Sequence, residues 1–452
     1  MKRAIVIGAG ISGLLTARVL STYFDEVLVL ERDKLPDAPH TRSGTPQDRH
    51  LHQILAGGQK IIEDLFPNLA QELLAVDAPQ LHWGVDNIIV TENGRLPKIE
   101  SGIITNTCSR VTFEYLIRKL VLADDSVTIL SNHQVQSLIM DDNQTITGLT
   151  VGKQSSQQLF ADFIVDASGK GSKTPEWYTD LGYDKPDYTK IDAHVGYSSC
   201  WFENLKDETG DFVMLQVADL ASKASNEKGQ RSGVIIKVDG ERYIALLTSN
   251  NKDYPPTDLA GFLDFAKTLR SDTYYNVLKD GTPISPVYGS RSTYNIRYHY
   301  EKLKRIPENY ILIGDAVCSF DPVIGQGMSM AAVEAQLLNT HLAQWTASSY
   351  DGFAKQFQSA LAKELTYPWL LATANDKFQP LAEGDIKTYP FIGDLQTGYF
   401  NLVLQAMESD RYILIAFFEV LNMLRSPLYL AHPKILWRIL RYKLTGYSNI
   451  SS

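Results

Sequence analysis

The chain has 452 residues, of which 44% are hydrophobic and 21% charged, a composition typical of a folded enzyme with room for two or three domains. Its formal net charge of −9 argues against nucleic acid as the main partner. The three cysteines, Cys108, Cys200 and Cys318, are widely separated and fit no disulfide or metal pattern, which favours reduced thiols and a cytoplasmic location. We expect neither a signal peptide nor a membrane span, because the first strand starts almost at once and no uncharged apolar run reaches about 18 residues.

The first predicted element is a buried strand over residues 4–7, which turns through three glycines into a helix over residues 11–20. Gly8 permits the tight turn, Gly10 lets backbone amides approach a pyrophosphate, and Gly13 lets the helix pack closely on the strand. The helix, which begins with Ile11 and Ser12, directs its positive N-terminal end at such phosphates. This segment therefore predicts a dinucleotide site.

A second strand over residues 26–30 ends at Glu31. An acid about 20 residues after the glycines is placed to accept hydrogen bonds from ribose hydroxyls and disfavours a 2′-phosphate. The nucleotide is therefore predicted to be an adenosine without that phosphate. The basic residues Arg32 and Arg42 are included among the predicted cofactor-binding residues.

Residues 42–55 form a motif rich in polar residues, and residues 51–74 have helical periodicity. His50 and His52 are two positions apart, so on a helix they do not share a face and make a poor metal site. We predict no metal. One of the two histidines is expected to border the cofactor and the other to pack or cap, and neither is assigned as a general base.

Further along the chain, residues 109–122 are predicted to form a helix with Ser109 as its N-cap and with Arg110, Glu114 and Arg118 spaced one turn apart. Strands are predicted over residues 126–130, 134–140, 146–151 and 162–166. The last of these strands feeds a turn at Asp166.

Residues 193–249 change in character to alternating strands, which predict an antiparallel sheet inserted into the dinucleotide domain. These strands are expected over residues 193–202, 211–217, 233–238 and 242–248. A substrate pocket would lie between this sheet and the cofactor. Its candidate lining residues, each of which also suits a core position, are Phe202, Met214, Ile236, Leu246, Pro286 and Tyr288.

The dinucleotide fold resumes near residue 310 with a strand that ends at Gly314 and Asp315, an acid suited to binding sugar-like hydroxyls. A turn with Pro322 and glycines then opens a helix over residues 328–342, whose first amides suit an anion or an electron-rich ring edge. Together with the opening glycines, this region predicts a single dinucleotide held at both ends, and FAD is the cofactor that fits. The residues assigned to this end are Gly314, Asp315, Gly325, Gln326, Gly327 and Met328.

The order of these motifs resembles that of the single-component FAD-dependent monooxygenases of the para-hydroxybenzoate hydroxylase class. The resemblance implies that Asp315 binds the ribityl chain and that the amides of residues 325–328 face the flavin pyrimidine edge. It also implies that Arg110 reaches the pyrophosphate or ribityl side and that Asp166 belongs to a motif associated with FAD and NAD(P)H.

Residues 42–55 narrow the resemblance to bacterial flavin epoxidases of polyene and terpenoid pathways, distantly similar to squalene epoxidase. Gln47, His50 and Pro322 are the candidates for residues beside the reactive ring. The chain departs from the expected pattern at two positions: Asp321 stands where asparagine is expected, and Thr45 replaces a usual valine.

The function implied is a monooxygenase of secondary metabolism. NADH or NADPH, as a transient co-substrate, would reduce FAD, and O₂ would form a C4a-hydroperoxyflavin that epoxidises or hydroxylates an apolar, electron-rich polyene, terpenoid or aromatic compound. The sequence chooses neither between the two nicotinamides nor between the two reactions.

Three alternatives have different chemistry. An isoprenoid reductase or desaturase similar to geranylgeranyl reductase shares the fold and the motifs. A flavin halogenase is disfavoured because the six tryptophans do not form the Trp-x-Trp-x-Ile-Pro motif of that class. A non-enzymatic prenyl-binding escort is disfavoured by the intact glycines, Glu31 and Asp315.

We therefore predict an α/β protein with a Rossmann-type FAD-binding domain (residues 1–75, 101–188 and 284–345), a substrate domain with an inserted antiparallel sheet (76–100 and 189–283) and a helical C-terminal region (346–452). In the last region, residues 412–424 and 435–444 are largely apolar, and the second stretch carries Arg438, Arg441 and Lys443. This region is expected either to touch a membrane surface or a hydrophobic substrate, or to cap the domain or form a dimer contact. Either a monomer or a homodimer fits the sequence.

Overall fold

The computed structural model describes residues 2–91, 94–142, 145–152, 156–206, 208, 210–218, 229–346, 349–386 and 390–446. Its first organising element is a five-stranded parallel sheet in the order β18-β11-β1-β2-β7. The strands are β1 (Arg3–Ile7), β2 (Glu26–Leu30), β7 (Val127–Leu130), β11 (Phe163–Asp166) and β18 (Tyr310–Leu312). The predicted Rossmann-type α/β fold is confirmed.

The central position of β1 explains why its residues are almost all apolar. Four of its five residues are buried, as expected for a strand in the middle of a parallel sheet with both faces covered. Ile7 pairs in parallel with both Leu30 and Asp166, so the carboxyl ends of these strands lie at one edge. Ligands of open α/β sheets bind at this edge. The helices of this layer include α1 (Ile11–Leu20), α4 (Arg110–Val121), α5 (Thr174–Asp180) and α8 (Gly327–Gln344).

The second sheet has ten strands and is built around two long ones, β12 (Tyr188–Glu203) and β17 (Tyr288–Tyr298). It is antiparallel as predicted, except that β13 and β4 pair in parallel. Strand β4 comes from a part of the chain well before the inserted strands, so no tight hairpin joins it to β13. The shorter strands are β4 (Asn87–Thr91), β5 (Gly94–Arg95), β13 (Met214–Val217), β14 (Ser232–Val238), β15 (Arg242–Ser249), β16 (Thr282–Pro283), β19 (Cys318–Ser319) and β20 (Glu383–Gly384).

Smaller elements complete the two layers. An antiparallel three-stranded sheet consists of β8 (Val135–Met140), β9 (Ile146–Val151) and β10 (Gln157–Phe160), and β3 (Gln80–His82) pairs with β6 (Ile104–Asn106). Helices α6 (Leu259–Ala266) and α7 (Thr273–Leu278) cover one face of the large sheet, where Phe262 and Tyr274 are fully buried.

The helix predicted over residues 51–74 is wrong in its extent. The structure has α2 (Ala56–Leu65) and α3 (Leu69–Ala75), with Pro67 between them, and residues 51–55 are not helical. Proline disfavours helical backbone before it, which separates the two helices. The stretch before α2 instead reaches the start of α8, where the Leu55 amide donates to Ser329 Oγ at 2.9 Å.

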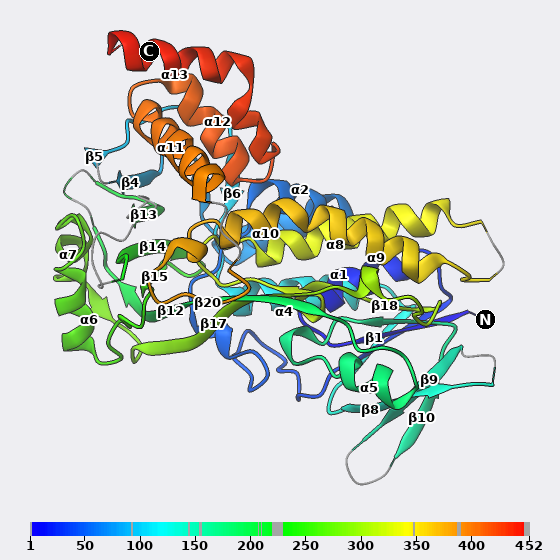
Figure 1. Ribbon diagram of the computed structural model, residues 1–452. Helices are drawn as coiled ribbons and strands as arrows, with labels where there is room; N and C mark the ends of the chain where they lie inside the picture. Colours follow the sequence, from blue (N-terminus) through cyan, green and yellow to red (C-terminus); the bar gives the residue numbers. More distant parts are fainter. Residues whose placement is uncertain are drawn as a thin grey trace.

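The C-terminal region contributes to two separate cores. Helix α9 (Phe353–Glu364) buries Phe353 and Phe357 against the parallel sheet, and α10 (Thr366–Thr373) follows it. Helices α11 (Pro390–Met407), α12 (Arg411–Leu421) and α13 (Pro433–Thr445) stack at one end of the molecule, beyond β4 and β5 (Figure 1). Their core includes Leu404 and Phe418, packed with Met214 and Ile236 of the large sheet. No helix in the described parts of the chain is both long enough and apolar enough to cross a membrane.

Candidate functional site

The glycine turn after β1 is shaped by close packing at two positions and by open space at a third. Gly8 has a φ of +101°, and a Cβ there would lie 2.6 Å from the Ala167 carbonyl oxygen. A Cβ on Gly13 would lie 1.9 Å from the Gly8 oxygen. Gly10, which precedes α1, would meet no atom within 4 Å. The turn therefore presents an open backbone surface at the start of a helix, the kind of site that binds phosphate.

The turn after β18 meets this glycine turn, although the two are far apart in the sequence. Gly314 has a φ of +66°, and a Cβ there would lie 2.5 Å from Ser12 Oγ. Its amide donates to the carboxylate of Glu334 on α8. Burial raises the pKa of Glu334 to about 8. The two motifs that predict a dinucleotide thus form one continuous wall.

Asp315 extends from this wall with its side chain exposed. The surrounding protein raises the pKa of the Asp315 carboxyl by desolvation, while the charges of Lys170 and Arg110 act in the opposite direction. An exposed carboxylate on a partly desolvated surface is suited to accept hydrogen bonds from the hydroxyls of a ligand.

The turn that opens α8 is the third open surface. Gly325 has a φ of +70°, and neither Gly325 nor Gly327 would meet an atom within 4 Å if it carried a Cβ. The side chain of Gln326 points elsewhere: it is buried and donates to the Pro368 carbonyl at 2.9 Å. The backbone of this turn, rather than the Gln326 side chain, is therefore free to face a ligand. Pro322 is exposed at its start.

Glu31 lies beside the glycine turn, where the sequence predicts it. Its Oε2 accepts from the Ala9 amide at 2.9 Å, its Oε1 accepts from the Asp33 amide at 3.0 Å, and Arg42 Nη1 lies 3.1 Å from Oε1. A carboxylate has about four acceptor positions, so these contacts leave capacity for a ribose hydroxyl. Arg32, in contrast, is exposed.

Arg42 and Arg110 are held in a buried network of carboxylates. Arg42 lies 3.0 Å from Glu114, and Arg110 lies 3.2 Å from the same carboxylate and hydrogen-bonds to Asp48. Burial lowers the pKa of Arg110, although Glu114 counteracts it, whereas the neighbouring carboxylates raise the pKa of Arg42 despite burial. Nothing in the local sequence indicates that Asp48 belongs to this network. Glu114 could be connected with Arg110 from the sequence, because the two residues are one helical turn apart.

The structure does not bring Asp166 to an open surface. Its side chain is fully buried and accepts from the Ser168 amide at 2.9 Å and from the hydroxyls of Ser172 and Thr174, both at 2.6 Å. These contacts give the carboxylate a structural role: it holds together the turn after β11. A direct contact of this carboxylate with a cofactor is therefore not favoured.

His50 and His52 lie in the extended segment before α2. They are not on a helix, so helical spacing does not describe how their side chains are placed. His50 is buried, with Nδ1 2.9 Å from Ser199 Oγ and its ring edge-on to Tyr197 at 4.5 Å. Burial, reinforced by the charges of His52 and Arg49, lowers the pKa of His50 to about 4, so it is neutral at pH 7. Gln47 is half-buried in the short 3₁₀ turn Pro46–Arg49. No group of three metal-ligating side chains occurs in the described part of the chain.

The face of the large sheet toward this segment carries residues that the sequence analysis did not select. Tyr197 and Ser199 contact His50, and Trp201 Nε1 donates to the Arg49 carbonyl at 3.1 Å. These three residues are spaced two apart along β12, so their side chains point to one face of the sheet. That spacing is the feature of the sequence from which their shared position could be predicted. Tyr288 and Leu246 pair with Ser199 across the sheet and share that face.

The other predicted lining residues lie elsewhere. Phe202 is buried on the opposite face of the large sheet, against α6 and α7, because it alternates with Trp201 along β12. Met214 and Ile236 are buried beneath the C-terminal helices. Pro286 is exposed.

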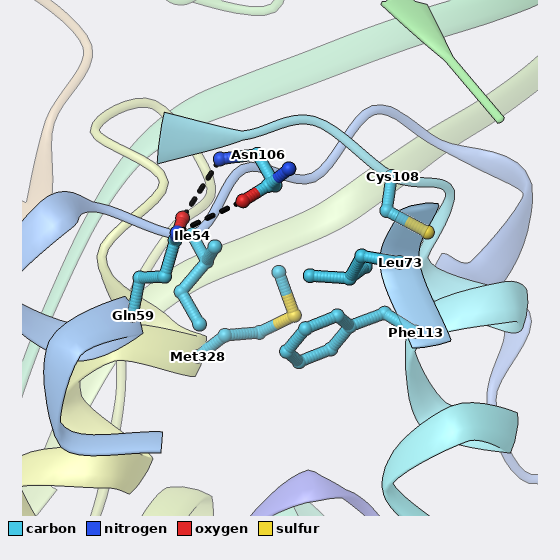
Figure 2. Close-up of a pocket in the computed structure, with 7 residues that line it drawn as sticks. All are labelled: Ile54, Gln59, Leu73, Asn106, Cys108, Phe113 and Met328. Carbon is cyan, nitrogen blue, oxygen red and sulfur yellow. Dashed lines mark hydrogen bonds between the residues drawn. The ribbon is translucent and has the colours of Figure 1, made fainter. Parts of the chain in front are cut away.

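A small cavity and a larger cleft lie near the start of α8 and on the large sheet. Met328 points into the first, toward Phe113 and Leu73 (Figure 2), and its volume of about 10 Å³ is close to what one water molecule requires. It is therefore a gap in the packing and not a substrate site. The second is a cleft of about 380 Å³ on the large sheet. Its lining residues are Tyr197, Ser198, Tyr254, Pro255, Thr257, Gly289, Ser290 and Arg291.

Several solved structures share this fold. The flavin-dependent brominase Bmp2 superposes with a TM-score of 0.63 at 15% identity, covering 90% of this chain and 92% of that one. CmlS, a flavin-dependent halogenase, gives 0.64 at 15% identity, covering 90% and 72%. PqsL, a probable FAD-dependent monooxygenase from Pseudomonas aeruginosa, gives 0.61 at 15% identity, covering 84% and 97%. At these identities the likeness establishes the fold.

A search with models of known protein families finds no match. Protein Rv3254 of Mycobacterium tuberculosis is 30% identical to this chain over 386 residues, which cover 82% of this chain and 80% of that protein. Because the similarity extends over most of both chains, the protein described here belongs to the family of Protein Rv3254.

Proposed function

We propose that this protein is an FAD-dependent monooxygenase that uses NADH or NADPH and O₂ to epoxidise or hydroxylate an apolar, electron-rich small molecule. One observation carries the proposal: the glycine turn after β1, the Gly314–Asp315 turn and the start of α8 present adjoining open surfaces. A Cβ on Gly10, Gly325 or Gly327 would meet no protein atom within 4 Å. The glycine turn would fit the pyrophosphate of FAD, the Gly314–Asp315 turn its ribityl chain, and the start of α8 the edge of its ring.

Bound FAD would supply the redox chemistry, taking hydride from the nicotinamide and activating dioxygen. The amides at the start of α1 would bind its pyrophosphate, and Asp315 would bind its ribityl hydroxyls. The amides of residues 325–328 would stabilise negative charge at the pyrimidine edge. His50 is neutral at pH 7, so it would add no charge to the space between the cofactor and the large sheet, which suits an apolar substrate.

A halogenase is the second candidate, because the structural neighbours include the brominase Bmp2 and the halogenase CmlS. Halogenases of this kind would need halide and would leave no atom of O₂ in the organic product. The six tryptophans of this chain do not form the motif expected of that class, so we rank this function below monooxygenation.

The proposal is tested with the purified full-length protein. Its visible spectrum should show bound flavin, and NADH or NADPH oxidation in air should increase when the correct polyene, terpenoid or phenolic substrate is added. With isotopically labelled O₂, one labelled atom should enter the product. Halide incorporation would instead indicate a halogenase. Addition of two hydrogens without O₂ uptake would indicate a reductase.

The C-terminal region supports a second proposal, that α13 contacts an anionic membrane surface. Leu436, Trp437, Leu440 and Leu444 are between 43% and 74% exposed on this helix. The same helix carries the basic residues Lys434, Arg441 and Lys443 and no acidic residue, whereas its Arg438 is paired with the buried Asp410 at 2.6 Å. An exposed apolar stripe with basic neighbours is typical of helices that lie in a membrane interface.

We expect the protein to sediment with vesicles that contain an anionic phospholipid and not with neutral phosphatidylcholine vesicles. Trp437→Ala or Leu440→Ala should weaken vesicle binding roughly 10- to 150-fold, because each removes about 1.5–3 kcal/mol of apolar burial. Leu74→Ala is the matched control, since Leu74 on α3 is 76% exposed and outside this surface. Equal binding of all three variants, or concentration-dependent dimers that the α13 variants disrupt, would contradict the membrane proposal.

A further inference from the structure

Three buried polar side chains from distant parts of the chain meet behind the turn that opens α8. Asp321 begins that turn, Asn295 lies on β17, and Asp376 lies in the 3₁₀ turn Asp376–Phe378 after α10. Their exposed fractions are 4%, 0% and 5%. Each comes from a different layer, so this cluster connects the FAD-binding fold, the large sheet and the C-terminal region.

The Asn295 amide is shared between the two aspartates. Its Nδ2 donates to Asp321 Oδ2 at 2.8 Å and to Asp376 Oδ2 at 2.7 Å, and its Oδ1 accepts from the Asp321 amide at 2.9 Å. The other oxygen of Asp321, Oδ1, accepts from the Val323 amide at 3.1 Å. The side chain of Asp321 therefore shapes the turn directly, and the Asp376 carboxyl is held against it by the same amide.

No cation in the described part of the chain forms an ion pair with either carboxyl. The charged groups that face the pair are Lys170, Lys377 and Asp192. Asp192 itself lies 3.7 Å from Lys190 and 3.6 Å from His194. Two adjacent carboxyls that are buried and unpaired cannot both be ionised, because each charge is desolvated and repels the other. Burial and the neighbouring Asp321 raise the pKa of Asp376 to about 10.

We propose that Asp321 and Asp376 share one proton at neutral pH, and that this shared proton holds the C-terminal segment against the turn that opens α8. Asp376 donates to Asp321, and Asn295 fixes both oxygens. In this arrangement Asp321 is a positioning residue for the turn and does not act on substrate. The link to flavin rests on the proposed function, whereas the shared proton itself does not.

The proton also limits the negative charge near the flavin edge. With one proton the pair carries a single charge, and without it the pair carries two. The C-terminal segment further contacts the large sheet, since Gln379 Oε1 accepts from Asn251 Nδ2 at 3.0 Å. Loss of the proton would separate Asp376 from Asp321 by repulsion and would loosen this three-way contact.

The pair should make stability depend on pH in a defined direction. The pKa of Asp376 is raised in the folded protein, so between its unfolded value of 3.8 and about 10 the folded state holds more protons than the unfolded state. Stability therefore decreases as pH rises through this window. In Asp376→Asn the amide still donates to Asp321 but cannot titrate. The decrease in melting temperature with pH should be smaller in this variant than in the wild type.

The experiment compares melting temperature from pH 5 to pH 9, and infrared spectra at neutral pH, for the wild type, Asp376→Asn and Asp321→Asn. We expect Asp376→Asn to lose one protonated-carboxyl band and to flatten the pH dependence. Asp321→Asn removes the neighbouring charge and the carboxylate that accepts the proton, so the band of Asp376 should shift and the pH dependence should again flatten. Asp264→Asn is the control, because Asp264 is an exposed carboxylate paired with Lys267 at 2.8 Å. Asp321→Asn provides an independent test if Asp376→Asn does not fold.

An unchanged band and an unchanged pH dependence in the variants would overturn the shared proton. These measurements do not require flavin, so they stand even if the purified protein proves colourless and the proposed function fails. In flavin-containing protein, the absorption spectrum of bound FAD should change at alkaline pH in the wild type and remain constant in Asp376→Asn. A spectrum that changes equally in both would overturn the connection to the flavin turn.

Discussion

Replacing Asp315 with alanine should remove FAD from the protein while leaving the fold intact. The Asp315 side chain is exposed on the wall formed by the two dinucleotide motifs, so its loss removes little native packing. A hydrogen bond to a charged group contributes about 1.5–3 kcal/mol, so the loss of each bond to the ribityl chain should weaken FAD binding roughly 10- to 150-fold. The measurement is the ratio of flavin to protein after purification, together with FAD titration of the apoprotein.

Asp315→Asn is the matched control for this prediction, because the amide keeps one acceptor oxygen but loses the charge. It should bind FAD with an affinity between those of the wild type and Asp315→Ala. Circular dichroism and melting temperature of the apoproteins should agree among all three. Stoichiometric FAD in Asp315→Ala would show that the carboxylate does not bind the cofactor.

Alanine at Gly10 and at Gly13 should both abolish FAD binding, but for different reasons. A Cβ on Gly13 would lie 1.9 Å from the Gly8 carbonyl oxygen, so α1 must move away from β1. Such overpacking costs about 1–3 kcal/mol or more, and the melting temperature should fall. A Cβ on Gly10 meets no protein atom within 4 Å, so Gly10→Ala should change stability by no more than about 1 kcal/mol.

The loss of FAD in Gly10→Ala would then report on the ligand alone, because the methyl group fills the space that a pyrophosphate would take. Measuring both the melting temperature and the FAD affinity of the two variants distinguishes Gly13, which the packing of α1 requires, from Gly10, which faces the ligand. Normal FAD affinity in Gly10→Ala would mean that the pyrophosphate lies elsewhere, even if Gly13→Ala unfolds as expected.

The layered fold could be predicted from local patterns because its strands are strongly marked. The residues of β1 are nearly all apolar, and the glycines after it are spaced as a strand-to-helix turn requires. The same patterns predicted Glu31 and Gly314 at strand ends, and parallel pairing places all strand ends at one edge. The break between α2 and α3 was missed because helical periodicity continues across Pro67.

The directions of individual side chains were harder to predict. Asp166 ends a strand and Asp315 lies shortly after one, yet Asp166 is buried because it accepts hydrogen bonds from three nearby donors that follow it in the chain. The apolar character of Phe202 suits a lining residue, but its position in the alternation of β12 places it on the face of the sheet away from His50. For these two residues the sequence specifies the chemistry of the side chain. It does not specify which residues surround that side chain, and the surroundings decide whether it can reach a ligand.

The individual strands and the two dinucleotide motifs can be predicted from the sequence, because each of them depends on residues that are close together in the chain. The packing of the layers is needed to see that Gly314 meets Ser12, that His50 bonds to Ser199, and that Asp321 and Asp376 share the amide of Asn295. These contacts join residues from different layers, and their geometry follows from how the two sheets and the C-terminal helices pack. Local periodicity contains no information about that packing.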